Sequence, residues 1–182
     1  MRDNLAVYSV SLLMGVLVVV STGFISLGGT GDVDISFPFQ DATVVYTVEG
    51  QSPMGQLFGT STYTVKEVGE ELYTVQVDHT GNLSRLPTFG DSQSEELGRD
   101  EPISFSSVVG ASDLVESRIV EMGDKEIKVN KYFLETEKEY GTETISIFMP
   151  EQVKVPLIFD YKYGDRFQIH IELDKTNISY LQ

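Results

Sequence analysis

From residue 43 onward, hydrophobic side chains recur at every second position, and this alternation constrains the fold more than any other feature. Val44, Tyr46 and Val48 fall on one face of the first such run, and Phe167, Ile169, Ile171 and Leu173 on one face of the last. A period of two is typical of a strand with one buried face. Similar runs lie at residues 57–65, 73–77, 144–149 and 157–163. With residues 112–121, a hairpin after Gly123 and a strand through Tyr132-Phe133, the expected total is about eight or nine strands.

Short glycine-containing turns separate these runs, and they indicate how the strands are connected. The turns are Val68-Gly69-Glu70, Met122-Gly123-Asp124, Tyr140-Gly141-Thr142 and Tyr163-Gly164-Asp165. Consecutive strands joined by tight turns pair antiparallel. Residues 112–121 come nearest to a helical period, but their β-branched content favours a strand. The sequence therefore predicts an all-β domain, an antiparallel meander that forms a sandwich or a strongly curved half-barrel.

Two segments interrupt the regular pattern. Residues 80–101 contain no clear alternation, so we expect a long loop that is either functional or mobile. Residues 149–156 carry a proline near each end, at Pro150 and Pro156. Because proline has no N–H to donate to a central ladder, this second segment is interpreted as a possible sheet edge.

The amino-terminal segment predicts the compartment. Residues 5–27 contain no charged side chain, and a helix of that length would be about 34 Å long, enough to cross a bilayer core. The length favours a retained transmembrane anchor, and a cleaved signal peptide is the alternative. Arg2 and the terminal amine precede the span, whereas Asp32 and Asp34 follow it. The positive-inside rule therefore places the carboxy-terminal bulk outside the cytoplasm, on a single-pass membrane protein.

The chain divides into three parts on this interpretation. Residues 1–27 are the membrane anchor or signal segment, residues 28–38 a glycine-rich flexible linker, and residues 39–182 the extracytoplasmic β-domain. The β-domain contains two N-glycosylation sequons, Asn82-Leu83-Ser84 and Asn177-Ile178-Ser179. Such sequons agree with a location outside the cytoplasm.

Charge and cysteine content exclude several classes of function. Of 182 residues, 13 are Lys or Arg and 28 are Asp or Glu, which gives a formal net charge of −15. A nucleic-acid partner is not expected, because phosphate binding needs a basic surface. The chain has no cysteine, so disulfides, thiolate metal sites, a cysteine nucleophile and a lipidated cysteine are all excluded.

The sequence lacks the common catalytic motifs, and we expect that the protein is not an enzyme. The sequence has no Gly-x-Ser-x-Gly elbow and no glycine-rich phosphate loop followed by a helix. Its two histidines, His79 and His170, are far apart, and alternation places His170 on the polar face beside Gln168 and Glu172. We interpret both histidines as facing solvent, and we expect neither a metal ion nor another cofactor.

Aromatic side chains are the candidate ligand-binding residues. Nine tyrosines and ten phenylalanines concentrate in the expected strands. A curved sheet that exposes part of its apolar face would use them to hold a lipid tail or a partner peptide. The alternative is an ordinary β-core whose tyrosine hydroxyls lie at its margins. The candidate residues are Tyr46, Tyr63, Tyr73, Phe133, Phe159, Tyr161 and Phe167.

The order of strands and turns resembles a known family. The run Thr43-Val44-Val45-Tyr46-Thr47-Val48-Glu49-Gly50 is followed by a Tyr-Thr-Val strand, and the chain closes through Ile145-Ser146-Ile147-Phe148, Val155-Pro156-Leu157 and Tyr163-Gly164-Asp165. This pattern, from Ala42 to Leu173, is similar to that of LolA/LppX-like half-barrel envelope proteins. The resemblance implies a curved sheet that cradles apolar ligands or lipoprotein acyl chains in the cell envelope.

A second resemblance concerns the layout of the whole chain. An uncharged apolar helix followed by a β-domain is also the arrangement of archaeal pilin-like and archaellum-stator-like proteins. Two hypotheses follow. The first is a membrane-anchored extracytoplasmic binding module that holds an apolar ligand or a protein partner on its curved sheet. The second is a structural subunit that assembles through its amino-terminal helix, either with copies of itself as a homo-oligomer or with a membrane complex.

Overall fold

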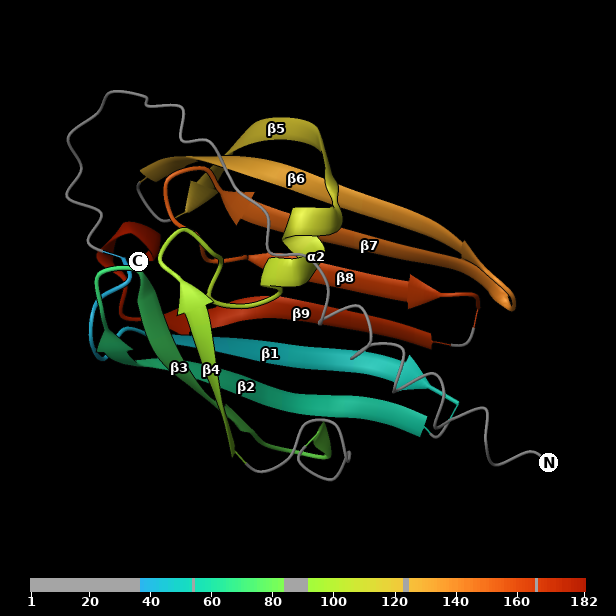
Figure 1. Cartoon of the computed structure of the whole chain (residues 1–182). Coiled ribbons are helices and arrows are strands. Elements are labelled where there is room, and N and C mark those ends of the chain that lie inside the picture. Colours follow the sequence, from blue (N-terminus) through green and yellow to red (C-terminus); the bar gives the residue numbers. More distant parts are fainter. Residues whose placement is uncertain (1–36, 54, 84–91, 123–124, 166) are drawn as a thin grey trace.

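The computed structural model describes residues 37–182, except 54, 84–91, 123–124 and 166 (Figure 1). The predicted anchor and all of the predicted linker except residues 37–38 lie outside the described residues. Within the described part, no helix has the length and apolar character needed to cross a membrane. The described elements are β1 (Thr43–Ser52), β2 (Gly55–Val68), β3 (Leu72–His79), β4 (Ser92–Gly98), α2 (Ser106–Ala111), β5 (Asp113–Met122), β6 (Lys125–Lys138), β7 (Gly141–Pro150), β8 (Ile158–Tyr163), β9 (Phe167–Thr176) and η3 (Ser179–Leu181).

The nine described strands form one antiparallel sheet in the order β4-β3-β2-β1-β9-β8-β7-β6-β5. This confirms the all-β class and the antiparallel meander. The sheet consists of two meanders, β1–β4 and β5–β9, which are joined where the first strand pairs with the last. It does not close, because β4 and β5 lie at opposite edges. In Figure 1, β3 and β4 turn steeply across the direction of the other strands, so the sheet is strongly twisted.

Strand alternation places the hydrophobic core as predicted. Val44, Tyr46 and Val48 of β1 are all buried, and the face of the sheet that carries them is called the core face below. Two apolar clusters make up the core. One joins β1, β2 and β3 to Val153, Val155 and the carboxy-terminal residues Ile178 and Leu181. The other lies over β7, β8 and β9.

A long crossover carries the chain from one edge of the sheet to the other. Residues 99–112 leave β4, pass through α2 and enter β5, the strand at the opposite edge. Figure 1 shows α2 lying across β7 and β8, and its residues Val108 and Val109 are buried in the core over these strands. The sequence analysis did not predict this helix, which is only six residues long.

The structure corrects two expectations about the irregular segments. Residues 80–101 are not one continuous loop, because Ser92–Gly98 forms β4 and pairs with β3. Residues 149–156 do not form a sheet edge, because they connect the interior strands β7 and β8. In this connection Val153 and Val155 are buried. Residues 112–121, by contrast, belong almost entirely to β5, as their β-branched content predicted.

Candidate functional site

The seven predicted ligand-binding aromatics do not form a single group. Tyr46, Tyr63 and Tyr73 belong to the first core cluster, and Tyr46 and Tyr63 meet edge to face with ring centroids 5.6 Å apart. Phe159, Tyr161 and Phe167 belong to the second cluster. Phe133 is half-buried and belongs to neither. Six of the seven are therefore part of the core, and ligand binding by them stays a prediction.

Three of these tyrosines use their hydroxyl groups within the chain. Tyr73 Oη donates to the carbonyl of Glu101 at 3.0 Å, and Tyr46 Oη accepts from Ser104 Oγ at 3.3 Å. Both partners lie in the crossover. Tyr161 Oη donates to Glu143 Oε1 at 3.0 Å. Burial raises the pKa of all three tyrosines far above the ordinary value, so each acts as a neutral hydrogen-bonding group.

Phe105 brings the crossover into the centre of the core face. Its ring stacks on Phe159 with centroids 4.1 Å apart and meets Tyr46 edge to face at 6.4 Å. The residue has φ of 60°, a left-handed conformation that is costly for a bulky side chain. The ring contacts offset that cost. The crossover thus covers apolar surface on which an apolar ligand was expected to lie.

A buried carboxylate, which the sequence analysis missed, lies near one end of β7. Glu143 is 2% exposed, and it accepts the hydrogen bond from Tyr161 described above. Lys138 Nζ lies 3.6 Å from its second oxygen, Oε2. A signal was present in the sequence, since Glu143 is in phase with the buried residues Ile145 and Ile147. This group has a polar partner on each oxygen, so it fits a structural role in the core.

The two histidines occupy different environments. His170 is exposed on the outer face, as predicted, and its Nδ1 lies 2.6 Å from Asp160 Oδ1. That hydrogen bond raises the pKa of His170. His79 is not solvent-facing as expected but half-buried, with Nδ1 2.9 Å from Ser61 Oγ, and burial lowers its pKa. Ser61 is 4% exposed, so its hydroxyl lacks the access that a nucleophile needs.

Metal binding receives no support from the described part of the chain. There, no three or more Asp, Glu or His side chains come together in a group that could hold a metal ion. The nearest approach to such a group is the outer-face pair His170 and Asp160, with Glu172 Oε2 3.6 Å from His170 Nε2. All three side chains are solvent-exposed.

Both sequon asparagines clamp the backbone. The side chain of Asn82 accepts from Phe58 N–H at 2.9 Å and donates to the carbonyl of Gln56 at 2.7 Å. Asn177 likewise accepts from Thr43 N–H at 2.8 Å and donates to the carbonyl of Asp41 at 2.9 Å. In each case Nδ2, the atom to which a glycan would be attached, is engaged with the backbone. The described fold therefore uses these asparagines as structural residues.

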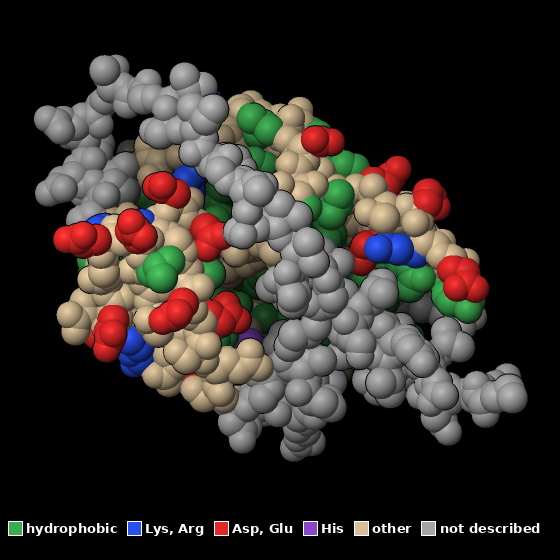
Figure 2. Space-filling view, viewed as in Figure 1, with side chains coloured by type: hydrophobic (Ala, Val, Ile, Leu, Met, Phe, Trp, Pro, Cys, Tyr) green, Lys and Arg blue, Asp and Glu red, His purple; other side chains and the backbone are tan. Residues whose placement is uncertain are grey.

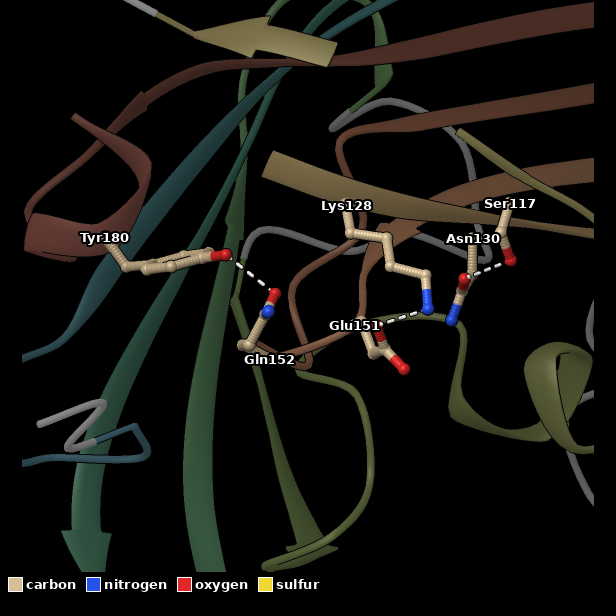
Figure 3. Close-up of polar contacts among 6 residues, drawn as sticks. All are labelled: Ser117, Lys128, Asn130, Glu151, Gln152 and Tyr180. Atoms are coloured by element: carbon tan, nitrogen blue, oxygen red, sulfur yellow. Dashed lines mark hydrogen bonds and ion pairs between the residues drawn. The ribbon is translucent and has the colours of Figure 1, made fainter. Parts of the chain in front are cut away.

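Three of the six large hydrophobic side chains found exposed among the described residues lie on β5. This strand pairs with β6 alone among the described strands, and Leu114, Val115 and Ile119 are 57%, 53% and 67% exposed. A series of polar contacts holds its inner side (Figure 3). Ser117 Oγ of β5 donates to Asn130 Oδ1 at 2.7 Å, and farther along β6 Lys128 pairs with Glu151 at 2.9 Å. Tyr180 Oη, in η3, donates to Gln152 Oε1 at 2.7 Å. Of these contacts, Ser117–Asn130 ties β5 to β6, and the other edge of β5 has no described strand beside it.

Charged side chains on the face shown in Figure 2 are mainly acidic. A shallow hollow of about 440 Å³ lies over β2, β3 and β4, lined by polar side chains that include Lys66, Glu67, Thr74, Gln76, Ser92 and Ser94. Its lining is suited to water and ions more than to an apolar molecule.

The comparisons with known proteins add no identity. No protein-family model matches the chain, and no curated protein matches it either. The function proposed below is therefore inferred from the sequence and structure of this chain alone.

Proposed function

We propose that this protein is a membrane-anchored binding module of the cell envelope, and that its β-domain engages a protein partner at the β5 edge. The observation that carries the proposal is the contrast between two surfaces. The core face is covered by the chain's own crossover, with Phe105 stacked on Phe159. The edge of β5 presents exposed apolar side chains beside backbone groups that no described strand pairs with. Edge strands of this kind accept an added strand from another polypeptide.

The proposal keeps the layout inferred from the sequence. The uncharged span of residues 5–27 serves as the anchor, and the β-domain lies outside the cytoplasm. It departs from the lipid-cradling function that the half-barrel resemblance implies, because apolar surface of the core face is already packed. It assigns no catalytic step, since Ser61, the hydroxyl paired with a histidine, is buried.

A structural subunit remains the second candidate, and the same β5 edge favours it. A subunit of an assembly also needs an exposed surface on which a neighbouring polypeptide can dock. The two candidates differ in stoichiometry: a binding module forms a defined complex with its partner, whereas a structural subunit forms larger arrays of itself.

Site-specific photocrosslinking tests the proposed function. A benzophenone amino acid replaces Ile119 in the full-length chain, in membranes of the cells that make it. A matched variant carries the probe at Gln168, an exposed position on the interior strand β9. We expect a polypeptide adduct from position 119 and none from position 168. No polypeptide adduct from position 119 would overturn the proposal.

A further inference from the structure

The two edges of the sheet differ in their protection. β4 is seven residues long and reads SQSEELG, so it is short and polar, as protected edge strands are. β5 is ten residues long and reads DLVESRIVEM, with four aliphatic residues and one basic one. Its protective features are four charged side chains and a β-bulge between Leu114 and Glu116. β5 is therefore the edge that is open to strand addition.

The sequence of β5 is complementary to itself when it is read in opposite directions. If Ser117 lies opposite Ser117 of a second copy in an antiparallel pair, Glu116 faces Arg118 twice, once on each side of the centre. Val115 and Ile119, both aliphatic, come next on either side, and the β-bulge between Leu114 and Glu116 ends the regular pattern there. Opposed charges and opposed aliphatic side chains both stabilise cross-strand pairing. No like charges meet within residues 115–119 in this register.

Neighbouring registers lack this complementarity. A shift that places Glu116 opposite itself, or Arg118 opposite itself, puts two like charges at the centre of the pair. A shift that centres on Ile119 places Arg118 opposite Val120 and leaves every charge without an opposite partner. Shifting one strand by a single residue would move its side chains to the opposite face of the sheet. Only shifts by two residues keep paired side chains on the same face, so the registers described above are the ones that compete with pairing at Ser117. The pattern thus specifies one register.

We propose that the partner taken up at the β5 edge is a second copy of this chain, paired antiparallel about a two-fold axis through Ser117. This inference rests on the proposed function, because it identifies the protein partner that the β5 edge would bind. A self-complementary patch is what a two-fold dimer requires. The two nine-stranded sheets would join edge to edge. The bulge lies outside the three central pairs, because β5 is regular from Glu116 to Met122.

The structure places the central side chains where this pairing can use them. Ser117 is exposed and bonded only to Asn130 on the inner side among the contacts shown in Figure 3. Arg118 is exposed, and its guanidinium lies 4.9 Å from the centroid of the Phe148 ring. Rotation of this long side chain brings it to Glu116 of the second copy. The strand pair is small, so the dimer is weak in dilute solution and strengthened when both copies are held in one membrane.

Charge exchange across the pair tests the register. E116R places like charges opposite each other at both central pairs, and so does R118E. We expect each variant alone to dimerise roughly tenfold more weakly than the unchanged chain. A mixture of the two variants restores both opposite-charge pairs in the mixed dimer, as does the double variant E116R/R118E in its own dimer. The measurement is sedimentation of full-length protein in detergent micelles, with circular dichroism confirming that each variant folds.

Cysteine crosslinking provides a second test, in a chain that has no native cysteine. S117C should form an intermolecular disulfide under mild oxidation, because opposed residues of paired strands have Cβ atoms about 4.5–5.5 Å apart. I119C serves as the control, since its counterpart in the second copy would lie about 13 Å away along the strand. Crosslinking of I119C but not S117C, or no rescue in the mixture of charge variants, would overturn the proposed register.

The photocrosslinking experiment separates failure of this inference from failure of the proposed function. An adduct from position 119 with twice the mass of the chain supports both. An adduct with a different polypeptide supports binding at the β5 edge and overturns the second copy as its partner. No polypeptide adduct overturns both.

Discussion

At the scale of single residues, the two sequon asparagines stabilise the fold through hydrogen bonds to the backbone, a role that the sequon motif does not indicate. Asn82 fastens the segment after β3 to the first residues of β2, and Asn177 holds the start of β1 against the end of β9. Each side chain both donates to and accepts from the backbone, a combination that an ionised carboxylate cannot provide. The sequence marked these positions for a different reason, as glycosylation sites, and the geometry of the hydrogen bonds became visible only in the structure.

Replacing either asparagine by aspartate should destabilise the domain. N177D and N82D keep the accepting oxygen but place a carboxylate against a backbone carbonyl, and we expect a loss of about 1–2 kcal/mol in the free energy of unfolding. N130D is the matched control, because Ser117 can still donate to the new carboxylate. Urea denaturation of the three variants measures the difference. Equal stability of all three would contradict the clamping role.

The two histidines should have opposite effects on stability as the pH changes. Burial lowers the pKa of His79, with Asp78 opposing the shift. The unfolded chain therefore binds a proton more readily at this position, and stability is lost as the pH falls below about 6.5. The pKa of His170 is raised, chiefly by the hydrogen bond to Asp160 and also by Glu172. Its contribution is present below about pH 6.5 and is lost as the pH rises through the raised value.

Thermal unfolding at about pH 5.5 and about pH 7.5 measures both effects. We expect H79Q to show a smaller drop in Tm between pH 7.5 and pH 5.5 than the unchanged chain. H170Q should show a larger drop, since it lacks the pairing that supports the protein at low pH. A change of the same sign in both variants would contradict the assigned environments.

At the scale of elements, the crossover is the part that sequence patterning could not reveal. Strand alternation identified β1, β7 and β9 because each of these strands buries one continuous face. The crossover is instead held by tertiary contacts, and its helix α2 is too short to show a helical period. β4 was missed for a related reason: as a polar edge strand, it lacks the alternation that marks a half-buried one.

Removal of the Phe105 ring should loosen the crossover. F105A loses the stacking on Phe159 and the contact with Tyr46, and we expect a loss of about 2 kcal/mol in the free energy of unfolding. F105G loses the same ring but relieves the left-handed backbone, so it should be about 1 kcal/mol less destabilised than F105A. F58A, at a phenylalanine that is 56% exposed, is the control and should change stability by less than about 0.5 kcal/mol. The reverse order of F105A and F105G in chemical denaturation would contradict this account.

At the scale of the whole molecule, the sequence predicted the fold class but not the joining of the two meanders. Hairpins are local, so turn glycines such as Gly141 and Gly164 indicated them correctly. The pairing of β1 with β9 links opposite ends of the domain, and no local pattern encodes it. Gly50 is the one position in β1 whose residue type reflects the pairing with β9. A Cβ on Gly50 would lie 2.4 Å from the carbonyl oxygen of Gln168, so the two strands approach too closely there for a side chain.

For the candidate site too, the sequence predicted features set by neighbouring residues but not contacts between segments that are far apart in the chain. The sequence identified aromatics on the correct strands, and the structure places six of them on the core face. It could not show that the crossover, which is distant in the chain from β8, brings Phe105 onto Phe159. Nor did alternation distinguish an edge strand from a central one, so the exposure of β5 had no sequence signal.

The net charge of −15 should make stability depend on salt. Repulsion among acidic groups opposes the compact state, and added ions screen it. We expect Tm to rise by several degrees between about 10 mM and about 500 mM NaCl at neutral pH. The same comparison near the isoelectric point of about 4.4 should give a much smaller rise. An equal rise at both pH values would assign the effect to something other than net charge.

The pairing of the first strand with the last also determines when the domain can form during synthesis. β1 leaves the ribosome before every other strand of the domain, and the neighbour that completes one of its two edges leaves last. Until then the amino-terminal meander has no connection to the rest of the sheet. Folding therefore waits for the carboxy-terminal strand. A stop codon between β8 and β9 would leave two half-sheets and no strand to unite them.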